Sequence, residues 1–286
     1  MKSKVLSFAV LIILAQMAQG SGWVDGSCNS GTGTYTWDDG NRYEGECKDG
    51  TLNGQGVLFH NSGDRYDGAF EDGQYNGKGS LTWVSGNRYE GDFEAGTVSG
   101  QGTLYLKNGD RYEGEFRGGR FHGRGTFIWI SGNKYVGEFN DGVIDGQGTR
   151  TWVNGNNYTG AFSDGNLHGQ GTFTWPTGNK YVGSFTNNTI NGEGVRTWAD
   201  GTRYEGEFED GVFDGQGTFT LIDGCNYVGE YESGKYNGQG TFTWVSGNRY
   251  VGEFQDDMIS GRGTKYYKNG KVEEGLWEDG KLVTGS

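Results

Sequence analysis

The sequence predicts an all-β fold, an elongated single sheet of about eleven stacked β-hairpins that repeat every 23 residues. First, Gly-x-Gly pairs recur at this step from Gly31 to Gly261 without one insertion. Second, tyrosine recurs on the same step from Tyr43 to Tyr250. Third, Phe, Trp and Tyr make up 15% of the chain. A fixed period of this length indicates a repeat architecture, and aromatic residues must supply most of its buried area.

Each repeat contains two short strands with one aromatic side, as residues 173–185 illustrate. Phe173–Trp175 and Tyr181–Phe185 both alternate aromatic with small or polar residues, which is typical of strands with one buried face. A two-residue loop between them would place Tyr181 opposite a threonine. A three-residue loop, Pro176–Gly178, that ends on a left-handed glycine places Tyr181 opposite Phe173 and gathers the aromatics on one face. Burial favours this second register.

A Gly-rich return loop, such as Asp141–Gly148, is expected to join each hairpin to the next in an up-and-down meander. We expect mid-strand glycines such as Gly183 to leave room for aromatic rings of the adjacent strand to lie across the backbone. The alternate positions carry threonines and acidic residues, which we expect to face water. These acidic positions include Glu44, Glu46, Glu90, Asp92, Glu113, Glu115, Glu205 and Glu207.

The repeat itself resembles a known family. A typical unit reads Tyr89-Glu-Gly-Asp-Phe93, then Gly96, then Gly100-Gln-Gly102. This pattern resembles the MORN repeat (membrane occupation and recognition nexus), and eleven units keep its phase from residue 31 to about 280. The resemblance implies an elongated sheet of stacked β-hairpins that serves as a binding or scaffolding array. We therefore assign residues 21–286 to one repeat array.

The first twenty residues have the pattern of a secretory signal peptide. Lys2 and Lys4 precede the apolar run Val5–Leu14, and the small residues Ala18 and Gly20 precede a polar stretch. We expect cleavage after Gly20 and delivery to the exterior, the periplasm or the lumen of the secretory pathway. The alternative, an uncleaved anchor, would have an apolar run shorter than the roughly 20 residues that span a bilayer.

Secretion would give a role to two candidate N-glycosylation sites and to one candidate disulfide. Asn157 and Asn187 each begin an Asn-x-Thr triplet and become candidate N-glycosylation acceptors in a eukaryotic host. Cys28 and Cys47 lie in neighbouring repeats and could form a disulfide in an oxidising compartment. Spacing alone does not fix the distance between two cysteines, so paired and free thiols both stay open.

Composition excludes a collagen-like structure, and net charge disfavours several classes of binding partner. Gly contributes 58 of 286 residues and Pro only one, which excludes collagen. The formal charge is −13, and loss of Lys2 and Lys4 leaves 22 basic and 37 acidic side chains, or −15. Nucleic acid phosphates and anionic lipids repel such a chain. We expect no nucleic acid partner and no strong membrane or phosphoinositide binding.

No constellation of residues suggests catalysis or a cofactor. Three Cys and three His show no metal-ligand spacing, and the Gly-x-Gly pairs lack the strand-to-helix context of nucleotide loops. Turn preference explains acid and amide pairs such as Asp141/Asp145 better than calcium binding does. Threonine pairs such as Thr172/Thr174 suggest an ice-binding surface only weakly, because charged neighbours spoil its flatness. We predict a protein that is not an enzyme.

Two positions break the aromatic pattern. Arg150 and Arg196 occupy the phase that holds Phe127, Phe173 and Phe219 in other repeats. Either their stems cover aromatic surface while the charges reach water, or they are cationic contacts within an aromatic groove. Tryptophans recur two residues later, and those nearest the arginines complete the candidate binding set. They are Trp129, Trp152, Trp175 and Trp198.

These observations favour a non-enzymatic repeat scaffold that mediates protein–protein interaction, with self-association as one option. The main alternative is a carbohydrate-binding module in which the tryptophans form a row of stacking platforms. A purely structural role for the tryptophans competes with both.

Overall fold

The computed structural model describes residues 22–25 and 28–285, which form strands and loops and no helix. The chain divides into two compact units, Met1–Val153 and Asn154–Ser286. Among the described residues, no helix has the length and apolarity to cross a membrane. The predicted signal peptide, residues 1–20, lies outside the described residues.

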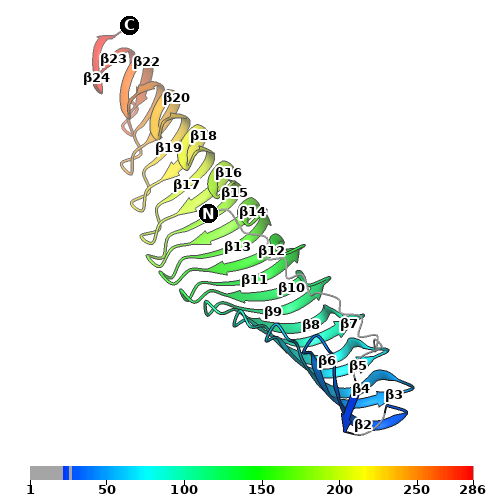
Figure 1. The fold of residues 1–286 in the computed structure, drawn as a ribbon. Coiled ribbons are helices and arrows are strands. Elements are labelled where there is room, and N and C mark those ends of the chain that lie inside the picture. Colours follow the sequence, from blue (N-terminus) through cyan, green and yellow to red (C-terminus); the bar gives the residue numbers. More distant parts are fainter. Residues whose placement is uncertain (1–21, 26–27, 286) are drawn as a thin grey trace. The chain divides into compact units, whose positions relative to one another are not determined.

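Both units are antiparallel meanders in which each strand pairs with the next along the chain (Figure 1). The first unit contains β1 (Gly22–Asp25), β2 (Ser30–Thr36), β3 (Arg42–Lys48), β4 (Thr51–Phe59), β5 (Arg65–Glu71), β6 (Gln74–Thr82), β7 (Arg88–Glu94), β8 (Thr97–Tyr105), β9 (Arg111–Arg117), β10 (Arg120–Ile128), β11 (Lys134–Asn140) and β12 (Val143–Thr151). The second contains β13 (Asn157–Ser163), β14 (Asn166–Thr174), β15 (Lys180–Thr186), β16 (Thr189–Thr197), β17 (Arg203–Glu209), β18 (Val212–Thr220), β19 (Asn226–Glu232), β20 (Lys235–Thr243), β21 (Arg249–Gln255), β22 (Met258–Tyr266), β23 (Val272–Glu278) and β24 (Lys281–Gly285). The predicted all-β hairpin repeat is confirmed.

The longer loop of each repeat has the predicted geometry. Phe173 pairs with Tyr181, and the Trp175 N–H donates to the Asn179 carbonyl (2.9 Å) while the Gly178 N–H donates to the Trp175 carbonyl (3.0 Å). Gly178 has φ +90°, a backbone conformation that side chains disfavour. The three-residue loop that ends on a glycine therefore sets the register, as expected.

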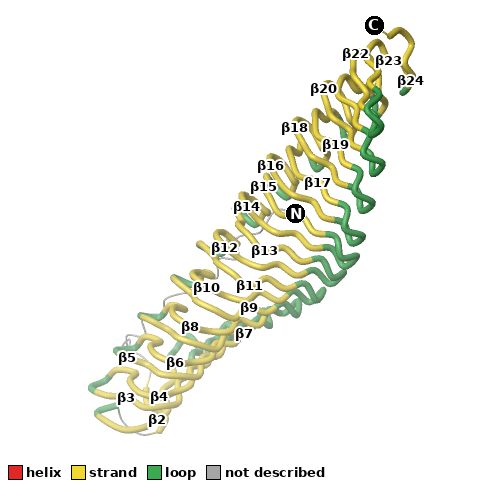
Figure 2. Tube along the Cα trace, turned by 180° about the vertical axis from the view of Figure 1, so that it is seen from behind, coloured by secondary structure: helices red, strands yellow, loops and turns green. Residues whose placement is uncertain are grey.

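The return connection differs from the expected long loop. Asp141 and Gly142 form a two-residue turn with φ of 47° and 87°, and β12 begins at once with Val143. Positive φ at both central residues is the turn that matches the twist of a hairpin. Sequence inspection interpreted all the glycines of this segment as loop residues, but only one of them turns the chain. The short turns and longer loops lie at the strand ends in Figure 2.

A bulge follows each two-residue turn and gives the acidic residues a structural role. In β8, Gly100 has φ +63° and a Cβ there would lie 2.9 Å from the Asp92 side chain. The Asp92 carboxylate accepts a hydrogen bond from the Gln101 N–H (2.9 Å). Glu115, Glu138, Glu207 and Glu230 accept the equivalent bond at 2.9–3.1 Å. These carboxylates thus hold the bulge and do not merely face water.

In each repeat up to Tyr250, one tyrosine ring lies across the paired mid-strand glycines of two adjacent strands. We call this position the crease. Tyr181 is fully buried, and its hydroxyl donates to the Ser184 carbonyl (3.1 Å). A Cβ on Gly194 of the next strand would lie 2.5 Å from Cζ of this ring, and a Cβ on Gly183 would lie 2.5 Å from Cα of Gly194. The glycines were expected to make room for rings of an adjacent strand. The ring that covers Gly183 is that of Tyr181, in the same strand β15, and it extends across to Gly194 of β16.

We expect Gly194→Ala to lower stability by about 1–3 kcal/mol, because the new methyl group must displace the Tyr181 ring or the paired backbone. Glu193→Ala is the matched control, since Glu193 is adjacent in β16 and exposed on the opposite face; we expect a change within about 0.5 kcal/mol. Thermal unfolding followed by circular dichroism measures both. Equal midpoints for the two variants would contradict the crease packing.

Alkaline pH should unfold the protein. Burial raises the pKa of Tyr158, Tyr181 and Tyr250 to about 12, whereas an unfolded tyrosine titrates near pH 10. Stability from these groups is fully present below about pH 10 and is lost as pH rises towards 12, because only the unfolded chain then ionises. We expect the denaturation midpoint to fall steeply between about pH 10 and pH 12. A midpoint that is constant across this range would contradict the burial.

Candidate functional site

In seven repeats the aromatic face continues into a half-buried tryptophan at the start of the longer loop. Phe173 and Trp175 lie 4.7 Å apart between ring centroids, and Phe127 and Trp129 are also 4.7 Å apart. The tryptophans at this phase are neither fully buried nor exposed. Both loop hydrogen bonds of Trp175 involve its own backbone, so the turn fixes the main chain from which the ring projects.

Each of the two arginines lies over two of these rings. In the first unit, Cζ of Arg150 is 5.2 Å from the centroid of Trp129 and 4.9 Å from that of Trp152. In the second unit, Cζ of Arg196 is 5.5 Å from Trp175 and 4.9 Å from Trp198. Guanidinium groups within about 6 Å of an indole face are attracted to it. The structure therefore brings each predicted arginine together with the two tryptophans predicted beside it.

Burial sets the electrostatics of both arginines. It lowers the pKa of each guanidinium, although arginine stays charged in proteins. Among the described residues, Nε of Arg150 and Nε of Arg196 are buried without a hydrogen-bond partner. A buried donor without an acceptor destabilises a fold by about 1–3 kcal/mol. In each guanidinium the Nε atom is therefore desolvated, while the side chain as a whole is half-buried.

A third cation at this phase, Lys265, was missed by sequence inspection. Its Nζ is 5.0 Å from the Trp244 centroid and 5.3 Å from that of Tyr267. Lys265 pairs across the sheet with Glu273, which stands where the other repeats carry the crease tyrosine. The available signal was the period, because Lys265 follows Arg196 by three repeats.

Glu273 is held ionised by its surroundings. Lys271 donates to it (2.6 Å), as does the hydroxyl of Tyr267 (2.6 Å). These hydrogen bonds, from Lys271 first, lower the pKa of Glu273, and the charge of Lys265 lowers it further. The cation of the last repeat thus has a carboxylate of the same chain across from it.

The structure places the two predicted cysteines close together with both thiols reduced. Cys28 and Cys47 are both buried, and the Cys28 thiol also donates to the Thr51 carbonyl (Sγ to O 3.6 Å). Burial, followed by a hydrogen bond with Cys47, raises the pKa of Cys28 to about 12. Disulfide formation stays a prediction.

The two glycosylation candidates differ in access. Asn187 is exposed at a two-residue turn with φ 50°, whereas Asn157 begins β13 and is half-buried. Their modification also stays a prediction. Of the acidic pair Asp141 and Asp145, weighed above for calcium, Asp141 occupies a left-handed turn position. In the described part of the chain, no group of three or more His, Cys, Asp or Glu could hold a metal ion.

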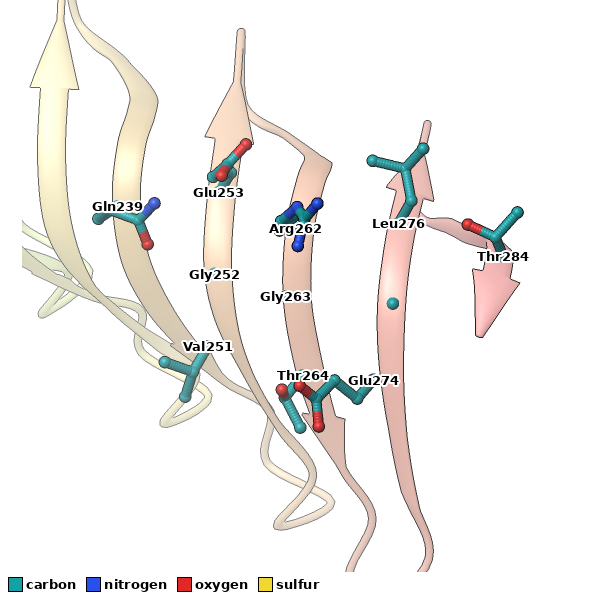
Figure 3. Close-up of a pocket in the computed structure, with 11 residues that line it drawn as sticks. Gln239, Val251, Gly252, Glu253, Arg262, Gly263, Thr264, Glu274, Leu276 and Thr284 are labelled. Carbon is teal, nitrogen blue, oxygen red and sulfur yellow. The ribbon is translucent and has the colours of Figure 1, made fainter. Parts of the chain in front are cut away.

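The opposite, polar face also has a hollow, of about 620 Å³, over β20–β24. Figure 3 shows Glu253 and Arg262 on one side of the central glycines and Thr264 and Glu274 on the other. The lining residues include no His, Cys or Ser. This hollow supplies opposite charges and hydroxyls but no nucleophile paired with a base.

Fold and faces together define a repeat scaffold with one aromatic and one charged surface. The model of the MORN repeat matches eleven consecutive segments from residue 30 to residue 272. The chain therefore belongs to the MORN repeat family, whose members are generally non-enzymatic scaffolds.

Other comparisons add little. No curated protein sequence matches the chain. Solved structures with some likeness include the TCP domain of Drosophila melanogaster SAS-4 (dCPAP) in complex with a proline-rich motif of Ana2, at 9% identity and TM-score 0.38, with 60% of this chain and 94% of that chain covered. The wild-type TCP10 domain of Danio rerio CPAP matches at 11% identity and TM-score 0.26, with 85% and 99% covered. Likeness this low supports no inference about function.

Arg196→Met should leave the fold as stable as before or more stable, because it removes a desolvated charge and an unpaired donor while keeping an apolar stem. Phe219→Met is the matched control one repeat later. We expect it to lower the thermal midpoint, since Phe219 packs on Trp198 at 5.6 Å. A loss of more than about 2 kcal/mol for Arg196→Met would show that the arginine holds the sheet together.

Proposed function

We propose that this chain is a non-enzymatic scaffold that binds a protein partner along the loop edge of its aromatic face. The observation that carries the proposal is a row of exposed aliphatic residues directly after the tryptophan phase. In the first unit, Val84, Ile130 and Val153 are 70–73% exposed. In the second unit, Ile222 is 71% and Val245 62% exposed. Rows of exposed apolar side chains mark interaction surfaces.

The backbone of this row is held in register from one repeat to the next. The Val84 N–H donates to Oδ1 of Asp64 (2.7 Å), and the Ile130 N–H donates to Oδ1 of Asp110 (2.8 Å). In the second unit the Ala199 N–H donates to Oδ1 of Asn179 (3.0 Å). A surface fixed in this way loses little conformational entropy on binding. We call these aliphatic residues, with the neighbouring tryptophans, the apolar edge.

The aliphatic residues favour a protein partner over a carbohydrate. A sugar site needs broad, open ring faces together with polar groups that bind hydroxyls. Here the tryptophans are half-buried, two of them in each unit lie against an arginine, and the most exposed neighbours are Val and Ile. We propose further that the protein acts outside the cytoplasm, which rests on the signal-like residues 1–20, and that a second copy is one candidate partner.

The apolar edge can be tested without disturbing the core. Ile222→Asp with Val245→Asp changes two exposed edge residues. Val228→Asp with Val251→Asp is the matched control on the polar face, where these residues are 46% and 37% exposed. The full-length chain is cross-linked to its partners in its native medium. We expect the amount of captured protein to fall at least tenfold with the edge variant and to stay unchanged with the control. Equal capture by both variants would contradict the proposal, and glycan-array binding that the edge variant abolishes would favour the carbohydrate alternative.

A further inference from the structure

Arg196 is a cation without a counter-ion on the aromatic face. It lies in β16 between Tyr181 of β15 and Tyr204 of β17, its two cross-strand neighbours. Both tyrosines are fully buried, and Trp175 and Trp198 lie against the guanidinium. Among the ion pairs of the described residues, none involves Arg196 or Arg150. A desolvated charge without a partner is costly to keep.

The same chain supplies carboxylates to several of its other arginines. On the polar face, each arginine of a recurrent Arg-Tyr-acid triplet pairs with the carboxylate two residues later. These pairs are Arg42–Glu44, Arg65–Asp67, Arg88–Glu90, Arg111–Glu113 and Arg203–Glu205. On the aromatic face, Lys265 has Glu273 across the sheet. Arg150 resembles Arg196, because its partner in β11 is Tyr135 and its Nε is also unpaired.

The group that Arg196 lacks is a hydrogen-bond acceptor. It must be one that can bind a guanidinium already flanked by two indole rings. With Nε buried and indole rings against the group, the outer Nη atoms are the donors left for a ligand. Arginine presents these donors as a planar fork that matches a carboxylate. With the net charge of −13, a polyanion would be repelled over a distance of about one Debye length. A single carboxylate among apolar residues would meet the arginine and the apolar edge together.

We infer that Arg150 and Arg196 each bind an aspartate or glutamate carboxylate of the protein partner, within an otherwise apolar segment of that partner. The inference rests on the proposed function, because it names the chemistry recognised at the same surface. It assigns the two arginines a role in specificity that the tryptophans and aliphatic residues cannot supply. A neutral segment would leave both guanidinium groups buried and unpaired in the complex, which disfavours it.

Nuclear magnetic resonance can test the anion sites directly on the mature chain. The probes are sodium acetate, its neutral counterpart acetamide, and inorganic phosphate, and the readout is the Nε–Hε resonance of each arginine. Arg196→Met and Arg150→Met assign the two resonances. We expect saturable shifts of both with acetate and none with acetamide, while Arg203, already paired with Glu205, does not saturate. Absence of saturation with acetate up to about 100 mM, which corresponds to a binding free energy weaker than about −1.4 kcal/mol, would overturn the inference. So would saturation with phosphate alone.

Partner capture then separates this inference from the proposed function. We expect Arg150→Met with Arg196→Met to reduce capture from the native medium at least tenfold. The matched control is Arg88→Met with Arg203→Met, whose guanidinium groups pair with Glu90 and Glu205 on the polar face, and we expect it to leave capture unchanged. Capture that depends on the apolar edge but not on the two arginines would overturn the inference and leave the scaffold proposal standing. Saturable acetate binding with no edge-dependent capture would overturn the proposed function and keep the anion sites.

Discussion

The contact between one tyrosine ring and one pair of glycines is the constraint on which every repeat depends. In the second unit, Tyr181 lies across Gly183 and Gly194, where a Cβ on either glycine would overlap the ring or the opposite backbone. The ring is fully buried although it belongs to a thin sheet, because it lies on the two glycines and packs edge-on against Phe185 and Phe208 at 5.2 and 5.1 Å between centroids. The fold needs no second layer of helices or strands to bury its aromatic residues, and this explains a core of tyrosine and phenylalanine with few aliphatic residues.

Much of this arrangement follows from the sequence, because it is strictly periodic. The register that sets Tyr181 opposite Phe173 could be predicted from one loop and the need to bury aromatics. The two-residue return turn could not be distinguished from a longer loop, because glycines also mark the bulge that follows it. The carboxylate of Asp92 looked like a solvent-facing residue, since alternation alone does not show that a bulge N–H needs an acceptor.

The candidate site was predictable only where it broke a pattern. Arg150 and Arg196 stand out because phenylalanine holds the same phase elsewhere. Lys265 escaped notice because the last repeat is degenerate at several positions. The unpaired Nε atoms could not be inferred from spacing, because they depend on which side chains approach a strand from its neighbours. The exposed row that includes Ile130 and Ile222 was also missed, since single apolar residues in loops are unremarkable until a structure aligns them.

The tyrosine constraint also explains why the two arginines lack a counter-ion. At Lys265, the chain supplies a carboxylate by placing Glu273 at the crease phase, and Trp277 then packs against Tyr250 at 5.5 Å with its Nε1–H donating to the Gly263 carbonyl (3.0 Å). An interior repeat has no such substitute. Tyr181 and Tyr204 flank Arg196 and each fills the crease of its own repeat, so an acidic residue at either position would remove a ring that the fold requires. A cation placed at this phase inside the array therefore has no carboxylate of its own chain across the strand, and its charge stays available to a ligand.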